Sequence, residues 1–126
     1  MRIVYLSLSG NIRKFINDGG IEATEISYSN PLIEINEDFV LIVPSYDQEI
    51  TDLMSEFIEY ENNEENLVAI VGSGSRNFND GFCFNAKDLS EKYNKPLIFK
   101  FEFSGTEDDI INFKKEVELI EITRTK

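Results

Sequence analysis

The stretch YLSLSGNIRKF, residues 5–15, places two serines, a glycine and an asparagine between a hydrophobic run and a segment with helical spacing. The run that leads into it, Arg2 to Leu6, is short and continuous, as in a buried strand. The segment that follows the polar residues, Ile12 to Asn17, predicts a short helix that ends at Gly19-Gly20. The stretch therefore predicts a strand, a small polar loop and a helix in direct succession.

Four more strands and three more helices are predicted along the chain. We predict the strands to span residues 22–28, 39–43, 67–71 and 96–103. We predict the helices to span residues 49–60, residues 80–93 and a last segment that begins at residues 104–107 and runs to about residue 119. Thr106 and Asp109 form a loose capping box for that last helix. Residues 61–66 are predicted to be a solvated polar turn.

Strands that alternate with helices on short connections predict an α/β fold with a parallel sheet. Five strands in this length predict a flavodoxin-like three-layer sandwich, with strand order 2-1-3-4-5 and helices on both faces of the sheet. The length of 126 residues, with no internal repeat or linker, predicts a single domain over residues 1–126.

The composition argues against several classes of function. Acidic residues outnumber basic ones by 24 to 12, and a net charge of -12 disfavours nucleic acid as a partner. With no histidine and one cysteine, we expect neither a metal site nor a Ser-His-Asp triad. We find no apolar run near the roughly 20 residues of a membrane span and no signal peptide, and we expect a cytoplasmic protein with no membrane partner.

Ligands of such sheets bind at the carboxyl ends of the strands, where the strand order reverses. The loops after the first, third and fourth strands meet there and are rich in small, polar and aromatic residues. The candidate cofactor-binding residues are Ser7, Leu8, Ser9, Gly10, Asn11, Ile12, Pro44, Ser45, Tyr46, Asp47, Ser73, Gly74, Asn77, Phe78, Phe82 and Cys83.

The first loop has the chemistry of a phosphate site. A helix N-terminus presents unpaired N–H groups and positive partial charge, and Ser7, Ser9 and Asn11 add side-chain donors. Together with aromatic residues in the other two loops, this cup fits a flat heterocycle that carries one phosphate, and flavin mononucleotide (FMN) is the natural candidate.

Simpler interpretations of the same residues exist. Ser9 or Asn11 could merely cap a helix. Tyr46 could be an ordinary exposed turn residue, and Phe78 and Phe82 could pack in the core. Cys83 is interpreted as a small hydrophobic residue of a helix rather than a redox group.

Two sets of residues resemble known families. Ser7-Leu8-Ser9-Gly10-Asn11 resembles the phosphate loop of flavodoxins. The segments 73–78, 95–97 and 100–106 resemble the NrdI family, which consists of small flavodoxin-like activators of class Ib ribonucleotide reductase. The resemblance extends over nearly the whole chain.

The resemblance to NrdI implies a cofactor, partners and a role. It implies FMN, reduced by a flavin or flavodoxin reductase, whose reaction with O2 supplies superoxide to the dimanganese site of the small reductase subunit, where a tyrosyl radical forms. It places Tyr46 beside the flavin and Gly74, Asn77 and Phe78 on the other side, with Phe78 as the stacking residue.

The chain departs from the family pattern after Tyr46. Family members often carry a glycine-rich stretch there, whose backbone can change conformation around the flavin N5 on reduction. This chain has Asp47-Gln48-Glu49 instead. The departure puts that backbone change in question, and it adds negative charge that disfavours an anionic reduced state.

Three other functions compete with this interpretation. An ordinary electron-transfer flavodoxin would share the site but not the reductase partner. A degenerate relative would have lost FMN and act through protein contacts alone. A response-regulator receiver shares the topology, but it needs an acidic pair after the first strand, where this chain has Ser7-Leu8-Ser9.

Overall fold

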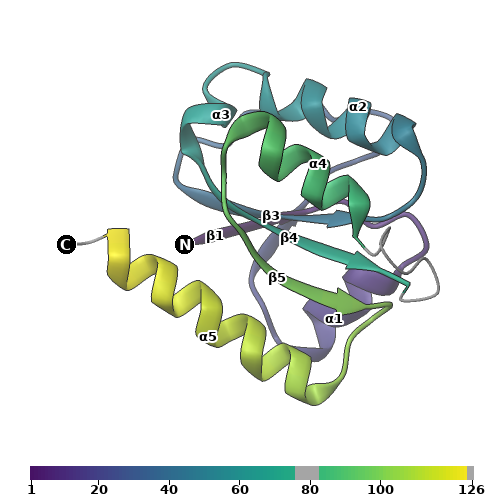
Figure 1. The fold of residues 1–126 in the computed structure, drawn as a ribbon, viewed down its shortest axis with the longest axis vertical. Coiled ribbons are helices and arrows are strands. Elements are labelled where there is room, and N and C mark those ends of the chain that lie inside the picture. Colours follow the sequence, from purple (N-terminus) through teal and green to yellow (C-terminus); the bar gives the residue numbers. More distant parts are fainter. Residues whose placement is uncertain (76–82, 125–126) are drawn as a thin grey trace.

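Five parallel strands form one sheet in the order β2-β1-β3-β4-β5 (Figure 1). The computed structural model describes residues 1–75 and 83–124. The strands are β1 (Arg2–Tyr5), β2 (Ala23–Glu25), β3 (Phe39–Pro44), β4 (Leu67–Gly74) and β5 (Leu97–Glu102). The helices are α1 (Asn11–Asp18), α2 (Gln48–Ile58), α3 (Asn63–Asn66), α4 (Phe84–Tyr93) and α5 (Glu107–Arg124). The predicted fold class and strand order are confirmed.

Helices cover both faces of the sheet, and each face has its own core. In Figure 1, α2, α3 and α4 lie on one side of the sheet, and α1 and α5 lie on the other. Val4 packs with residues of α2 and α4, whereas its neighbours Ile3 and Tyr5 pack with residues of α1 and α5. Successive side chains of a strand point to opposite faces, so one short strand contributes to both cores.

The middle strand β3 is buried along its whole length. Its residues from Phe39 to Val43 have no exposed surface. A strand covered on both faces must be apolar at every position, which explains the continuous hydrophobic run. β1 and β4 flank it, so the strands that end at the three predicted loops are neighbours in the sheet.

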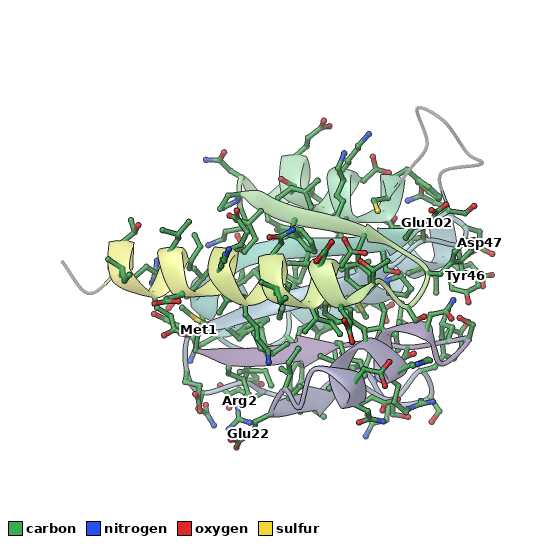
Figure 2. The ribbon with its side chains drawn as sticks, turned by 90° about the horizontal axis from the view of Figure 1, so that it is seen from below. Met1, Arg2, Glu22, Tyr46, Asp47 and Glu102 are labelled. Atoms are coloured by element: carbon green, nitrogen blue, oxygen red, sulfur yellow. The ribbon has the colours of Figure 1, made fainter. Side chains whose placement is uncertain are left out.

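The two ends of the sheet are clearly separate. Figure 2 shows Tyr46, Asp47 and Glu102 together at the carboxyl end, and Met1, Arg2 and Glu22 at the opposite end.

Among the described residues, no helix has both the length and the hydrophobicity needed to cross a bilayer.

Several element boundaries differ from the prediction. β2 ends at Glu25 rather than at residue 28, because the chain turns at an isolated bridge between Ser27 and Asn30. β4 continues to Gly74 rather than stopping at residue 71, because β5 pairs with it as far as Gly74. α4 begins at Phe84, and the part of its predicted range before residue 83 lies outside the described residues. α5 extends to Arg124.

Residues 61–66 do not form the solvated polar turn that the sequence predicts. It contains the short helix α3, and Asn63 has no exposed surface. Asn63 Oδ1 accepts from the N–H of Ile35 at 2.8 Å, and its Nδ2 donates to the carbonyls of Ile33 and Phe57, each at 2.8 Å. The loop before β3 thus obtains its backbone partners from a side chain about 30 residues away, as buried polar groups must.

We expect Asn63→Ala to lower the free energy of unfolding by about 3 kcal/mol, because it leaves buried backbone groups without partners. Urea denaturation of the purified protein measures this. Asn62→Ala is the control, since Asn62 is exposed and its side chain makes no capping bond. Equal losses in the two variants would contradict a specific role for Asn63.

Candidate functional site

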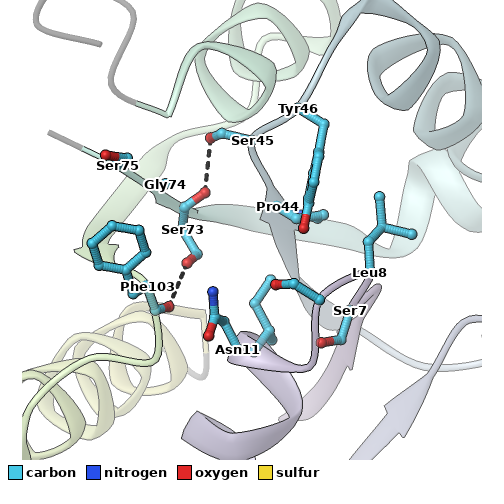
Figure 3. A pocket seen from close by; sticks show the side chains of 12 residues that line it. Ser7, Leu8, Asn11, Pro44, Ser45, Tyr46, Ser73, Gly74, Ser75 and Phe103 are labelled. Atoms are coloured by element: carbon cyan, nitrogen blue, oxygen red, sulfur yellow. Dashed lines mark hydrogen bonds between the residues drawn. The ribbon is translucent and has the colours of Figure 1, made fainter. Parts of the chain in front are cut away.

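A cavity of about 350 Å³ lies at the carboxyl end of the sheet (Figure 3). This volume is in the range of small-molecule sites. The residues that line it are Ser7, Leu8, Ser9, Asn11, Ile12, Pro44, Ser45, Tyr46, Ser73, Gly74, Ser75 and Phe103. The structure thus brings together most of the predicted residues of the three loops.

Three predicted residues that the structure describes are not among those that line the cavity. Gly10 lies in the first loop at the start of α1, Asp47 lies at the start of α2, and Cys83 is buried at the start of α4. Asn77, Phe78 and Phe82 lie outside the described residues. Conversely, Ser75 and Phe103 line the cavity without having been predicted.

The first loop leaves the N-terminus of α1 open toward the cavity. Its N-cap is Gly10, with φ of 90°, which has no side chain to accept from the first turn. The interpretation that Ser9 or Asn11 caps this helix is therefore wrong. Ser7 Oγ accepts from the N–H of Arg13 at 3.2 Å instead, which leaves the hydroxyl hydrogen of Ser7 able to donate.

The charge around the cavity is unusual for this protein. Among the described residues that line it, none is charged, although the chain carries 24 acidic residues. The first turn of α1 contains no acidic residue, whereas α2 and α5 both do. The positive end of the α1 dipole is therefore not neutralised by a carboxylate of its own first turn.

A network of three side chains holds α1, which follows the first loop, against the sheet. Arg13 of α1 pairs with Glu25 of β2, with 3.0 Å between Arg13 Nε and Glu25 Oε1. Tyr5 of β1 donates its hydroxyl to the same carboxylate at 3.0 Å. The hydrogen bond from Arg13 lowers the pKa of Glu25, and burial, together with Glu25, raises the pKa of Tyr5. The network ties α1 to the first two strands.

The second loop is fixed by a buried side chain from α4. Asn85, which has no exposed surface, accepts from the N–H of Tyr46 at 2.8 Å. Its Nδ2 donates to the carbonyl of Asp47 and to Thr51 Oγ1, each at 2.8 Å. Asp47 itself accepts from the N–H of Glu49 and so caps α2. Asn85 thus positions the backbone at Tyr46, whose side chain forms one wall of the cavity, the Tyr46 wall.

Small residues let β4 form the floor of the cavity. A Cβ on Gly74 would lie 2.8 Å from Ser45 Oγ, and a Cβ on Gly72 would lie 2.8 Å from the Cβ of Cys83. Ser45 Oγ also donates to the carbonyl of Ser73 at 2.7 Å. The glycines therefore allow both the second loop and the start of α4 to approach the strand closely. Cys83 is buried there at φ of 59°, at the N-cap of α4 rather than within the helix.

The strand order and the layers of helices define a flavodoxin-like fold. The structure is similar to a short-chain flavodoxin associated with a bacterial microcompartment, with 18% identity, a TM-score of 0.63, and coverage of 97% of this chain and 96% of that one. It is also similar to oxidised flavodoxin 2 from Bacillus cereus, with 16% identity, a TM-score of 0.53, and coverage of 94% and 93%. A third similar structure is a Fusobacterium nucleatum flavodoxin bound to flavin mononucleotide, with 19% identity, a TM-score of 0.50, and coverage of 98% and 96%.

A more specific assignment comes from the sequence family. The family model described as NrdI flavodoxin-like matches residues 3–115, which is most of the chain. The chain therefore belongs to the NrdI flavodoxin-like family, and the resemblance noted from its sequence motifs is confirmed.

We expect Glu25→Gln to lower the melting temperature slightly at pH 7, because the ion pair with Arg13 is solvent-exposed and screened. The folded pKa of Glu25 is depressed, so its contribution is present above the unfolded pKa of about 4.3 and is lost as the pH falls below it. Melting curves from pH 7 to pH 3 measure this, with Glu22→Gln as the control for loss of one exposed charge. A wild-type advantage that is as large at pH 3 as at pH 7 would contradict the ionic origin.

Proposed function

We propose that this chain binds FMN in the cavity at the carboxyl end of the sheet. The observation that carries the proposal is the acid-free first turn of α1 beside a cavity whose described lining residues are all uncharged, in a strongly acidic chain. Membership of the NrdI flavodoxin-like family supports it.

The first loop fits the phosphate of FMN. The N–H groups of Asn11 and Ile12 and the side chains of Ser7, Ser9 and Asn11 would supply the donors. No lysine is needed, because the helix dipole and charge-assisted hydrogen bonds favour the anion. The space beside the Cα of Gly10 is open, since the only atom near an added Cβ would be the end of the Arg13 side chain, at 3.8 Å.

The rest of the cavity fits a flat apolar ring. Leu8, Pro44, Tyr46 and Phe103 supply apolar surface, and Tyr46 and Phe103 lie on opposite sides of the cavity in Figure 3. Leu8, Tyr46 and Phe103 are all exposed, at 36%, 46% and 50%. Large apolar side chains that gather at a cavity mouth are better explained by a ligand than by folding.

We propose further that the protein is an activator of class Ib ribonucleotide reductase. Bound FMN would supply the redox chemistry, which in this family is the reaction of the reduced flavin with O2 that yields superoxide. The protein would bind and orient the flavin and dock on the small reductase subunit, and a flavin or flavodoxin reductase would be the electron donor. No side chain of the cavity is needed as an acid or base.

The second loop is held by Asn85 on both sides of the peptide between Tyr46 and Asp47. The N–H of Tyr46 and the carbonyl of Asp47 are both bonded to buried Asn85, and α2 begins at the next residue, Gln48. These bonds hold the Ser45–Tyr46 peptide and the Asp47–Gln48 peptide, which flank the peptide between Tyr46 and Asp47. We therefore infer that both ends of this segment keep their positions in both oxidation states.

We expect wild-type protein to bind both FMN and riboflavin, with FMN bound more tightly. Ser9→Asp should weaken FMN at least tenfold, because it places a carboxylate beside the phosphate, and should leave riboflavin unchanged. Quenching of flavin fluorescence measures both affinities. Asn62→Asp, which adds the same charge to an exposed residue at the other end of β4, is the control. Failure of the wild type to bind either flavin would favour the degenerate relative.

We expect the reduced FMN-loaded protein to generate a tyrosyl radical in a Mn(II)-loaded small subunit of class Ib reductase when O2 is admitted. Electron paramagnetic resonance measures the radical. The same protein without FMN is the control and should give none. Electron transfer to a generic acceptor without radical formation would indicate an ordinary flavodoxin instead.

A further inference from the structure

Phe103 occupies a backbone position that normally requires glycine. The N–H of Gly105 donates to the carbonyl of Glu102 at 2.9 Å, which closes a four-residue turn directly after β5. Phe103 is the first central residue of this turn, and its φ is +53°. Glycine, asparagine and aspartate dominate such positions, and a bulky aromatic residue there is an outlier.

The surrounding structure holds Phe103 in this conformation from both sides. Its N–H donates to the carbonyl of Gly74 at 3.0 Å, and its carbonyl accepts from Ser73 Oγ at 2.7 Å. Both partners belong to β4 and line the cavity. Strained residues persist only where several interactions determine their backbone together, and they concentrate at functional sites.

The turn is also anchored on its far side. Gly105 has φ of +71°, and a Cβ there would lie 2.9 Å from the ring of Phe15, a core residue. Thr106 and Asp109 then exchange two hydrogen bonds as a capping box for α5. The backbone of Phe103 therefore cannot relax by a small movement of the turn.

Packing in the folded protein does not account for the aromatic ring. The Phe103 side chain is 50% exposed, so its burial offsets little of the conformational cost. The neighbouring Phe101 is 1% exposed and stacks on Phe15 with ring centroids 4.1 Å apart, as a residue retained for packing does. The ring of Phe103 instead lies at the cavity, across from Tyr46 (Figure 3).

We propose that Phe103 is a flavin-contact residue, held in a strained backbone conformation so that its ring covers the face of the heterocycle across from Tyr46. The inference rests on the proposed FMN binding. Contact between flat aromatic rings is favourable beyond the area that it buries, and a ring already held in place loses little freedom when the ligand binds.

The test is Phe103→Gly, which relieves the strain and removes the ring together. We expect the ligand-free variant to melt at or above the wild-type temperature, while its dissociation constants for FMN and riboflavin both rise about tenfold. A contact with the flavin ring should affect FMN and riboflavin alike, whereas the contact of Ser9 with the phosphate should affect FMN alone. Phe103→Leu, which keeps apolar bulk without a flat ring, should also weaken both flavins.

The matched control is Glu61→Gly, because Glu61 also has a positive φ, of 49°, and is exposed away from the cavity. It should change the melting temperature without changing flavin affinity. Wild-type affinity in Phe103→Gly would overturn the proposal, and so would a marked fall in the melting temperature of its ligand-free form, which would assign the ring to packing. A wild-type protein that binds no flavin in the same titration would instead overturn the proposed function on which the inference rests.

Discussion

The pairing of β3 with both β1 and β4 is the constraint on which the cavity depends. Because β1 also pairs with β2 on its other side, the chain leaves β1 toward one edge of the sheet and leaves β3 toward the other. The helices that follow these strands, α1 and α2, lie on opposite faces (Figure 1). The loops after β1 and β3 must therefore part from one another, and the crevice results from strand order before any lining residue is considered.

Charge distribution gives this crevice its chemical character. The acidic residues Asp47 and Glu49 occupy the start of α2, and Glu107, Asp108 and Asp109 occupy the start of α5, where each favours the helix dipole. The start of α1 has a glycine cap and no acid in its first turn. A protein with a net charge of -12 repels anions over most of its surface, so the start of α1, beside a cavity with no charged residue among the described ones that line it, is a favourable place for an anion.

The features that could be predicted from the sequence are those that local pattern determines. The buried run at β3, the helical spacing of Ile50, Met54 and Phe57, and the capping box at Thr106 each follow from neighbours in the chain. The roles of Asn63 and Asn85 could not be predicted, because their partners lie about 30 to 40 residues away and asparagine in a polar stretch is typical of exposed turns. The place of Phe103 at the cavity could not be predicted for a related reason. The residues around it in the sequence do not indicate a positive φ, and the hydrogen bonds that impose this φ come from β4.

The two side walls of the cavity are thus rigid for different reasons. Asn85 fixes the backbone beside Tyr46, and β4 fixes the backbone of Phe103. Walls that are already held in place reduce the ordering cost of binding. The carboxylate of Asp47 lies next to the Tyr46 wall and opposes negative charge there. If the cavity holds FMN as proposed, this carboxylate destabilises an anionic reduced state relative to the oxidised one, and a less stabilised reduced state is a stronger reductant toward O2.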